Sequence, residues 1–204
     1  MTSIKCQTSS PHDWNTKRRN KMPLVDCLKE ILRSGAWEKG RPSNGHRVIK
    51  LKDKQSGMEI CIRTSEPVLV ICAEKEGGAL KHLSCLKSGC NKICDYLVIF
   101  QSNANYYAVF IETKETMRDQ KGHEQLRRSL PILDYLVSAC KIEHNINPRI
   151  SVKYVLVSEK VNSKFDKQPI RPISTKSINK KYKGIMVKEF IGKTDFFVST
   201  LAGL

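Results

Sequence analysis

Two short apolar runs on either side of a polar turn form the clearest pattern in the chain. Residues 96–100 and 107–111 are rich in Val, Ile, Tyr and Phe, and residues 102–105 between them include the polar run SNAN. Short β-branched and aromatic runs that flank such a turn predict two buried strands joined as a β-hairpin. With the turn centred between Asn103 and Ala104, Asp95 stands directly opposite Glu112.

This register gathers charged residues at the open end of the hairpin. Because alternate side chains of a strand share a face, Lys114 projects on the same side as Glu112. Two carboxylates on adjacent strands suit Mg²⁺, which takes oxygen ligands and completes its shell with water and phosphate. A lysine beside them is able to orient or deprotonate a water and to stabilise charge on phosphorus. The alternative is that Asp95 and Glu112 merely end their strands and Lys114 is a salt-bridge partner.

Helical and strand patterns alternate along the rest of the chain. Residues 24–32 carry apolar side chains at helical spacing, with Pro23 in the first turn and Gly35 at the end. Residues 115–144 predict a long amphipathic helix, which Pro131 should kink or split. The remaining apolar runs predict strands, with 37–45 as a loop: a meander at 46–52, 58–63 and 67–74 that leads into the hairpin, a strand at 150–158, and a terminal hairpin at 184–190 and 195–201.

These elements predict an α/β protein with a central mixed β-sheet, and 204 residues fit one domain. The first 22 residues are polar and basic, as in a flexible arm, so the domain is expected to span 23–204. The chain contains no apolar run of about 18 residues, the length a membrane span needs, and no apolar signal region. We therefore expect a cytoplasmic protein.

The formal net charge of +16 favours a polyanionic partner, with nucleic acid first. An anionic membrane surface ranks second, because no basic amphipathic helix with bulky aromatic residues is visible. Residues 160–183 are rich in lysine and predict a basic loop that tracks a nucleic-acid backbone or is simply solvated.

The chain has eight cysteines, and without a signal peptide they are expected to be free thiols. Cys85, Cys90 and Cys94 have the spacing C-x4-C-x3-C, which admits a zinc or iron–sulfur site. Since no C-x2-C pair is present, small buried or loop thiols are the better interpretation.

Several enzyme classes are excluded by motifs that the sequence lacks. GxxxxGK[ST] and GxGxxG are absent, which removes the warrant for nucleotide hydrolysis and for a dinucleotide cofactor. HExxH and GxSxG are absent too, and no cysteine has an evident histidine and acid partner.

The charged residues of the hairpin resemble the PD-(D/E)XK nuclease superfamily, which has the restriction endonuclease-like fold. Asp95 begins one strand, Glu112, Thr113 and Lys114 end the next, and the following helix carries Gln125. The likeness covers roughly residues 94–140, and the predicted order strand–strand–strand–helix–strand through residue 158 agrees with it. Cys94 stands where that family's motif has proline.

The resemblance implies a metal-dependent phosphodiesterase with a restriction endonuclease-like core, a central mixed sheet flanked by helices. Asp95 and Glu112 would hold Mg²⁺ or Mn²⁺ together with the carbonyl of Thr113. Lys114 would act on the attacking water and Gln125 would support the lysine or the water. The resemblance favours DNA over RNA as substrate and an endonuclease over an exonuclease. It implies a role in bacterial or phage defence, restriction or repair.

Basic residues near this motif are candidates for contact with backbone phosphates. Arg127 and Arg128 lie on the predicted helix, and Lys180 and Lys181 lie in the basic stretch. His123 is expected to be a surface imidazole.

Two other functions remain open. The chain is alternatively a nucleic-acid-binding subunit of a larger complex that uses the same fold and never cuts. It is otherwise a structural zinc protein organised by Cys85, Cys90 and Cys94. A protein partner or a homo-oligomer is compatible with each of these functions.

Overall fold

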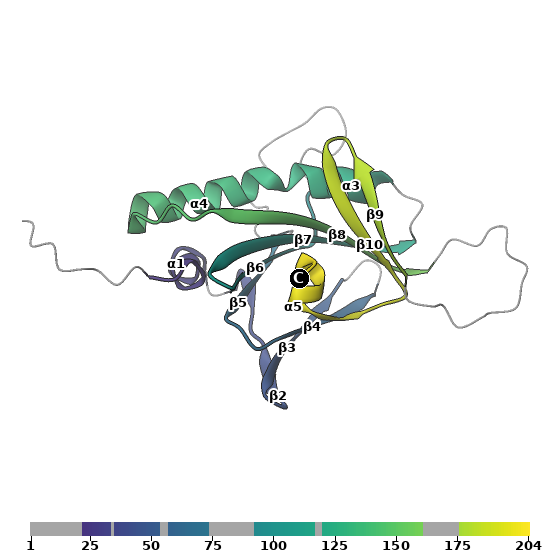
Figure 1. The fold of residues 1–204 in the computed structure, drawn as a ribbon, viewed down its shortest axis with the longest axis horizontal. Helices are drawn as coiled ribbons and strands as arrows, with labels where there is room; N and C mark the ends of the chain where they lie inside the picture. Colours follow the sequence, from purple (N-terminus) through teal and green to yellow (C-terminus); the bar gives the residue numbers. More distant parts are fainter. Residues whose placement is uncertain (1–21, 34, 54–56, 74–91, 117–119, 161–175) are drawn as a thin grey trace, which may run out of the picture.

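A mixed sheet of seven strands forms the centre of the protein, as a computed structural model shows for residues 22–33, 35–53, 57–73, 92–116, 120–160 and 176–204. The strand order is β1-β5-β6-β7-β8-β10-β9 (Figure 1). β7, β8 and β10 run parallel to one another and the other neighbours are antiparallel, which confirms the predicted α/β class with a mixed sheet. In sheet order, the bounds are Trp37–Glu38, Val68–Cys72, Tyr96–Ser102, Asn105–Thr116, Ile150–Lys160, Ile185–Ile191 and Lys176–Tyr182.

Each face of this sheet is covered by a different layer. Helices α1, α3 and α4 pack on one face, and a second, four-stranded sheet with helix α5 packs on the other (Figure 1). The helices span Leu24–Ile31, Gln120–Arg128, Leu130–His144 and Val198–Ala202. The second sheet has the order β11-β4-β3-β2, with bounds Asp195–Phe197, Glu59–Thr64, His46–Lys52 and Arg41–Ser43.

Burial on both faces explains the unbroken apolar runs of the central hairpin. In β6, Leu97 and Ile99 belong to the core under the helices, whereas Val98 and Phe100 belong to the core under the second sheet. A strand buried on both sides needs apolar residues at every position, not at alternate ones. The unbroken apolar run in the sequence therefore indicates a strand in the centre of the sheet.

The β6–β7 hairpin has the predicted register. Its two-residue turn has positive φ at Asn103 and Ala104, as in a type I′ turn, and Tyr96 pairs with Ile111. Continuing this ladder by one residue brings Asp95 opposite Glu112. The turn therefore places both acids at the same end of the sheet.

The predicted long helix is divided, as expected, but at Ser129 rather than at Pro131. α3 ends at Arg128 and α4 begins at Leu130, so Pro131 lies in the first turn of α4, where its missing N–H is harmless. The Ser129 hydroxyl accepts a hydrogen bond from the Cys94 N–H at 2.8 Å and donates one to the Gln125 carbonyl at 2.7 Å. The break thus joins the helices to the segment before Asp95.

Three predictions about strands are wrong. β3 and β4 belong to the second sheet, so the chain changes layer before β5 and does not form one meander. Residues 37–45, predicted as a loop, contain β1 and β2. The predicted terminal hairpin does not form. After β10 the chain returns to the second sheet, where β11 lies parallel to β4, because Phe196 packs into that core and against Phe190 at a ring distance of 4.9 Å.

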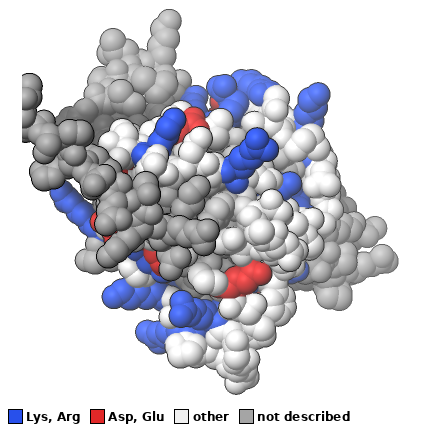
Figure 2. All heavy atoms as spheres, turned by 60° about the vertical axis from the view of Figure 1, so that its left-hand side comes forward, with Lys and Arg blue, Asp and Glu red and all other residues white. Residues whose placement is uncertain are grey.

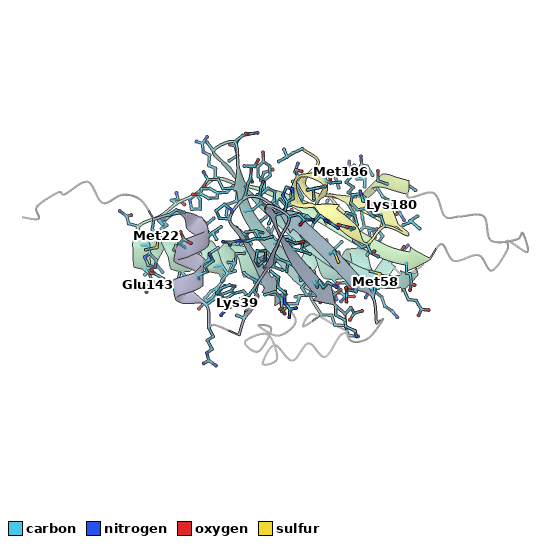
Figure 3. All side chains as sticks on the ribbon, turned by 90° about the horizontal axis from the view of Figure 1, so that it is seen from below. Met22, Lys39, Met58, Glu143, Lys180 and Met186 are labelled. Carbon is cyan, nitrogen blue, oxygen red and sulfur yellow. The ribbon has the colours of Figure 1, made fainter. Side chains whose placement is uncertain are left out.

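The described helices include none that is long and apolar enough to cross a membrane. The predicted basic arm lies outside the described residues. Figure 3 places Met22 and Glu143 at one end of the molecule and Lys180 and Met186 at the other.

Candidate active site

Asp95 directly precedes β6 and is held in place by the neighbouring strand β7. Its Oδ2 accepts hydrogen bonds from the Thr113 N–H at 2.7 Å and from the Thr113 hydroxyl at 2.6 Å. These two bonds fix the carboxylate beside Glu112. The predicted role of the Thr113 carbonyl stays a prediction, since the contacts seen here use its other polar groups.

Glu112, Lys114 and Gln125 form a chain of contacts next to Asp95. Glu112 is fully buried and its Oε1 lies 2.5 Å from the Lys114 Nζ. The same ammonium donates to Gln125 Oε1 at 3.0 Å, and Gln125 Nε2 donates to the Ile93 carbonyl at 3.1 Å. The structure therefore brings the four predicted catalytic residues together.

The Glu112 carboxylate is only partly satisfied. Both oxygens are buried, and within the described part of the chain Oε1 contacts the Lys114 ammonium while no hydrogen bond of good geometry reaches Oε2. The Asp95 N–H lies close enough to lower the pKa of the carboxylate, but less than burial raises it. Burial first, and then the negative charge of Asp95, raise the pKa of Glu112 to about 8, although Lys114 opposes the shift. Burial also raises the pKa of Asp95, against its bonds from Thr113.

This donor set fits a divalent cation. Two hard carboxylates lie at neighbouring positions of β6 and β7, one carboxylate oxygen lacks a well-formed hydrogen bond, and both groups resist ionisation without a compensating positive charge. The described residues contain no group of three His, Cys, Asp or Glu side chains close enough to hold a metal. Among the described residues, backbone groups would therefore supply further ligands, and water and substrate would complete the shell.

Asp53 is an acidic neighbour that the sequence reasoning missed. It directly follows β3 in the second sheet, and its negative charge contributes to the raised pKa of Asp95. No local signal identifies it, because its position depends on how the second sheet packs on the first.

Helix α3 approaches the site closely through Gly122. A Cβ at this position would lie 2.9 Å from Leu156 Cδ1 and 3.5 Å from both Glu112 Cγ and Lys114 Cε. Glycine therefore allows the helix to lie directly over the acid and the lysine.

Gly122→Ala is expected to destabilise the protein by about 1 kcal/mol, because the overpacking of the buried Leu156 side chain exceeds the roughly 1 kcal/mol that alanine gains over glycine in a helix. Denaturant unfolding measures the change. Gly35→Ala is the matched control, since a Cβ there meets nothing within 4 Å, and it should leave stability nearly unchanged. Equal unfolding midpoints for the two variants would contradict the close approach.

His123 lies in the core, so its prediction as a surface imidazole is wrong. The residue is 1% exposed, and its Nε2 lies 2.7 Å from Glu189 Oε1 on β10. Its ring also lies 5.0 Å from the ring of Tyr182. No local pattern predicts this contact, because Glu189 is distant along the chain and the pattern pairs its strand with residues 195–201 instead.

The predicted phosphate contacts fall on two faces. Lys180 and Lys181 lie on strand β9, not in a loop, and pair with Val187 and Met186 of β10. Val187 belongs to the core under the helices, so Lys180 lies on the α3 side and Lys181 on the other.

The two arginines at the end of α3 both turn toward one acid of the same helix. Arg127 Nη2 lies 3.2 Å from Glu124 Oε2, and Arg128 Nε lies 3.9 Å from the same oxygen. Neither arginine points at the acids of the candidate active site in these contacts. Glu124 also contacts Tyr182 and Lys183, so the two arginines lie beside the turn between β9 and β10.

Cys94 is a buried thiol that donates to the Tyr96 carbonyl at 3.3 Å, and burial raises its pKa. Cys85 and Cys90 lie outside the described residues, so the proposed metal spacing stays a prediction. The five described cysteines carry thiols that are not joined in a disulfide: Cys27, Cys61, Cys72, Cys94 and Cys140.

Comparison of the chain with protein-family models, with curated proteins and with solved structures finds no match.

Proposed function

We propose that this protein is a metal-dependent phosphodiesterase that cuts nucleic acid. The observation that carries the proposal is the buried, partly unsatisfied Glu112 carboxylate beside Asp95, with Lys114 held between Glu112 and Gln125. A salt bridge that merely ends the strands would not require a buried carboxylate or a lysine held by a second partner. Burying a carboxylate oxygen without a well-formed hydrogen bond costs stability, and such a cost is common where a site binds a ligand.

Asp95, Glu112 and the Thr113 carbonyl would hold Mg²⁺ or Mn²⁺. When bound, the ion supplies positive charge to the phosphate and lowers the pKa of a bound water. Lys114 orients the attacking water and stabilises charge on the phosphate oxygens. Gln125 fixes the ammonium in place, and its own amide is oriented by the Ile93 carbonyl, which leaves Oε1 facing the lysine.

A restriction endonuclease-like core belongs to the same proposal. It is supported by the antiparallel β5-β6-β7 order, by the helices that follow, and by β8 returning parallel to β7. The net charge supports a nucleic-acid substrate, and Figure 2 shows many more Lys and Arg than Asp and Glu side chains on the face it presents. DNA is preferred because the residues resemble a family that acts mainly on DNA.

A nucleic-acid-binding subunit that never cuts is the second candidate, and the same charge supports it. The buried acids argue against it, since two carboxylates next to a phosphate weaken binding unless a cation lies between them. Asp95 and Glu112 thus make the difference between the two functions.

Cleavage of supercoiled plasmid, linear duplex and single-stranded RNA, each with Mg²⁺, Mn²⁺ or EDTA, tests the proposal. We expect nicking and linearisation of DNA with either metal, none in EDTA, and none by Asp95→Asn. Salt-sensitive DNA binding without cleavage under any metal condition would favour the binding subunit instead.

A further inference from the structure

A carboxylate on helix α3 lies at the centre of a cluster of hydrogen-bond donors that is separate from the candidate active site. Glu124 Oε1 accepts from the Tyr182 hydroxyl at 2.9 Å and forms an ion pair with Lys183. Its Oε2 accepts from Arg127 Nε at 3.3 Å and Nη2 at 3.2 Å, with Arg128 Nε at 3.9 Å. We call these four donors and Glu124 the Glu124 cluster.

The donors come from two elements that lie side by side. Arg127 and Arg128 end α3, whereas Tyr182 and Lys183 lie at the tip of the β9–β10 hairpin beside that helix (Figure 1). The buried contact of His123 with Glu189 ties the same helix to the same hairpin. The cluster is therefore held in place by packing beneath it.

Positive charge exceeds negative charge in this cluster. Three cations surround one carboxylate, and Lys180 lies on the same face, 3.9 Å from Glu189. The cations remain accessible to a partner, since the side chains of Arg127 and Lys183 are 46% and 60% exposed. Their pull lowers the pKa of Glu124 to about 2, with Lys183 the largest cause.

The arrangement matches what a phosphate group needs. Arginine forks, a lysine ammonium and a tyrosine hydroxyl are the donors that bind phosphate oxygens, and a phosphate offers more acceptors than a carboxylate. Exposed ion pairs contribute little to stability, so a simple brace between helix and hairpin gains little from gathering three cations.

We propose that the Glu124 cluster binds a backbone phosphate of the nucleic acid outside the cleavage site, and that Glu124 occupies the place of this phosphate in the free protein. The inference rests on the proposed function for its partner, but not on cleavage. Glu124 and Gln125 are neighbours on α3 and point different ways, Gln125 toward Lys114 and Glu124 toward the hairpin. One helix thus serves both sites.

Binding in EDTA separates this inference from catalysis. The probe is a fluorescein-labelled DNA duplex, followed by fluorescence anisotropy over a range of salt. Glu124→Gln should raise the affinity by about three- to tenfold, because the competing anion is lost and the cations stay. Glu143→Gln makes the same change of charge at the other end of the molecule (Figure 3) and should change the affinity by less than about twofold.

A second pair of variants removes donors. Lys183→Ala should weaken binding and lower the salt slope by about one, the change expected for a lost phosphate contact. Lys39→Ala removes the same charge from an exposed position that Figure 3 places away from Lys180, and it should have a smaller effect. If Glu124→Gln proves unstable in thermal unfolding, the comparison of Lys183→Ala with Lys39→Ala carries the test alone.

Equal affinities for Glu124→Gln and Glu143→Gln, or for Lys183→Ala and Lys39→Ala, would overturn the inference. So would a gain by Glu124→Gln that appears on phosphatidylserine vesicles but not on DNA. If the protein never cuts but Glu124→Gln raises its affinity for DNA as expected, the proposed cleavage activity is contradicted and the proposed phosphate site at the Glu124 cluster is supported.

Discussion

Replacing Glu112 by glutamine is expected to stabilise the metal-free protein by about 1–3 kcal/mol at pH 8 while removing cleavage. Glu112 is fully buried with one oxygen that lacks a well-formed hydrogen bond, and its raised pKa makes the folded state hold a proton that the unfolded chain releases. Stability is therefore present at acid pH and is lost as pH rises from the ordinary glutamate range to about 8. Glutamine does not titrate, and its amide oxygen still accepts from Lys114.

Urea unfolding of wild type and Glu112→Gln at several pH values in EDTA measures this effect. The difference should be small at pH 5 and should grow toward pH 8. Glu115→Gln, an exposed position on the same strand, is the control and should show no such growth. If Glu112→Gln were less stable than wild type at pH 8, the ionised Glu112 side chain would not destabilise the folded state, which would contradict this prediction.

Lys114→Met is expected to lower the cleavage rate by about 100- to 10,000-fold with little loss of DNA affinity. The ammonium contacts both Glu112 and Gln125, so it is positioned at the acids rather than spread over the surface. Methionine keeps the length and the apolar stem of the side chain and removes only the charge. Single-turnover cleavage, with binding measured separately in EDTA, gives both quantities.

Lys29→Met removes the same charge from α1, where the lysine pairs with Asp26, and should leave the rate nearly unchanged. Equal rate losses in the two variants would assign the effect to net charge. A large loss of DNA affinity in Lys114→Met alone would make the lysine a binding residue rather than a catalytic one.

The geometry of the candidate site was predictable because it depends on local rules. A two-residue turn at Asn103 and Ala104 fixes the hairpin register, and the alternation of side chains then sets Glu112 and Lys114 on one face. These relations span few residues and need no knowledge of the other layers. The place of Gln125 beside Lys114 was implied by the resemblance to the PD-(D/E)XK superfamily and not by the spacing of the residues.

Contacts between distant segments were not predictable in the same way. The pairing of His123 with Glu189 depends on β10 lying beside β8, and β10 was predicted to pair with residues that in fact enter the second sheet. Asp53 likewise reaches the site only because β3 and β4 form a separate layer. No periodicity in the sequence reports which sheet an amphipathic strand joins.

The opposite orientation of Lys180 and Lys181 has a simpler cause. Both residues were placed in a loop, where neighbouring side chains have no fixed relation, but a strand sends them to opposite faces. The lysine-rich composition hid a strand because β9 is the edge of the sheet, where exposed lysine is common.

The most direct test of the account is a calorimetric titration of Mn²⁺ into the metal-free protein, since it asks whether the two acids hold a metal whatever the substrate. We predict binding that strengthens from pH 6 to pH 8 with release of protons, and that is lost in both Asp95→Asn and Glu112→Gln. The same binding in wild type and both variants, or no binding by wild type with DNA present, would contradict a metal site at Asp95 and Glu112.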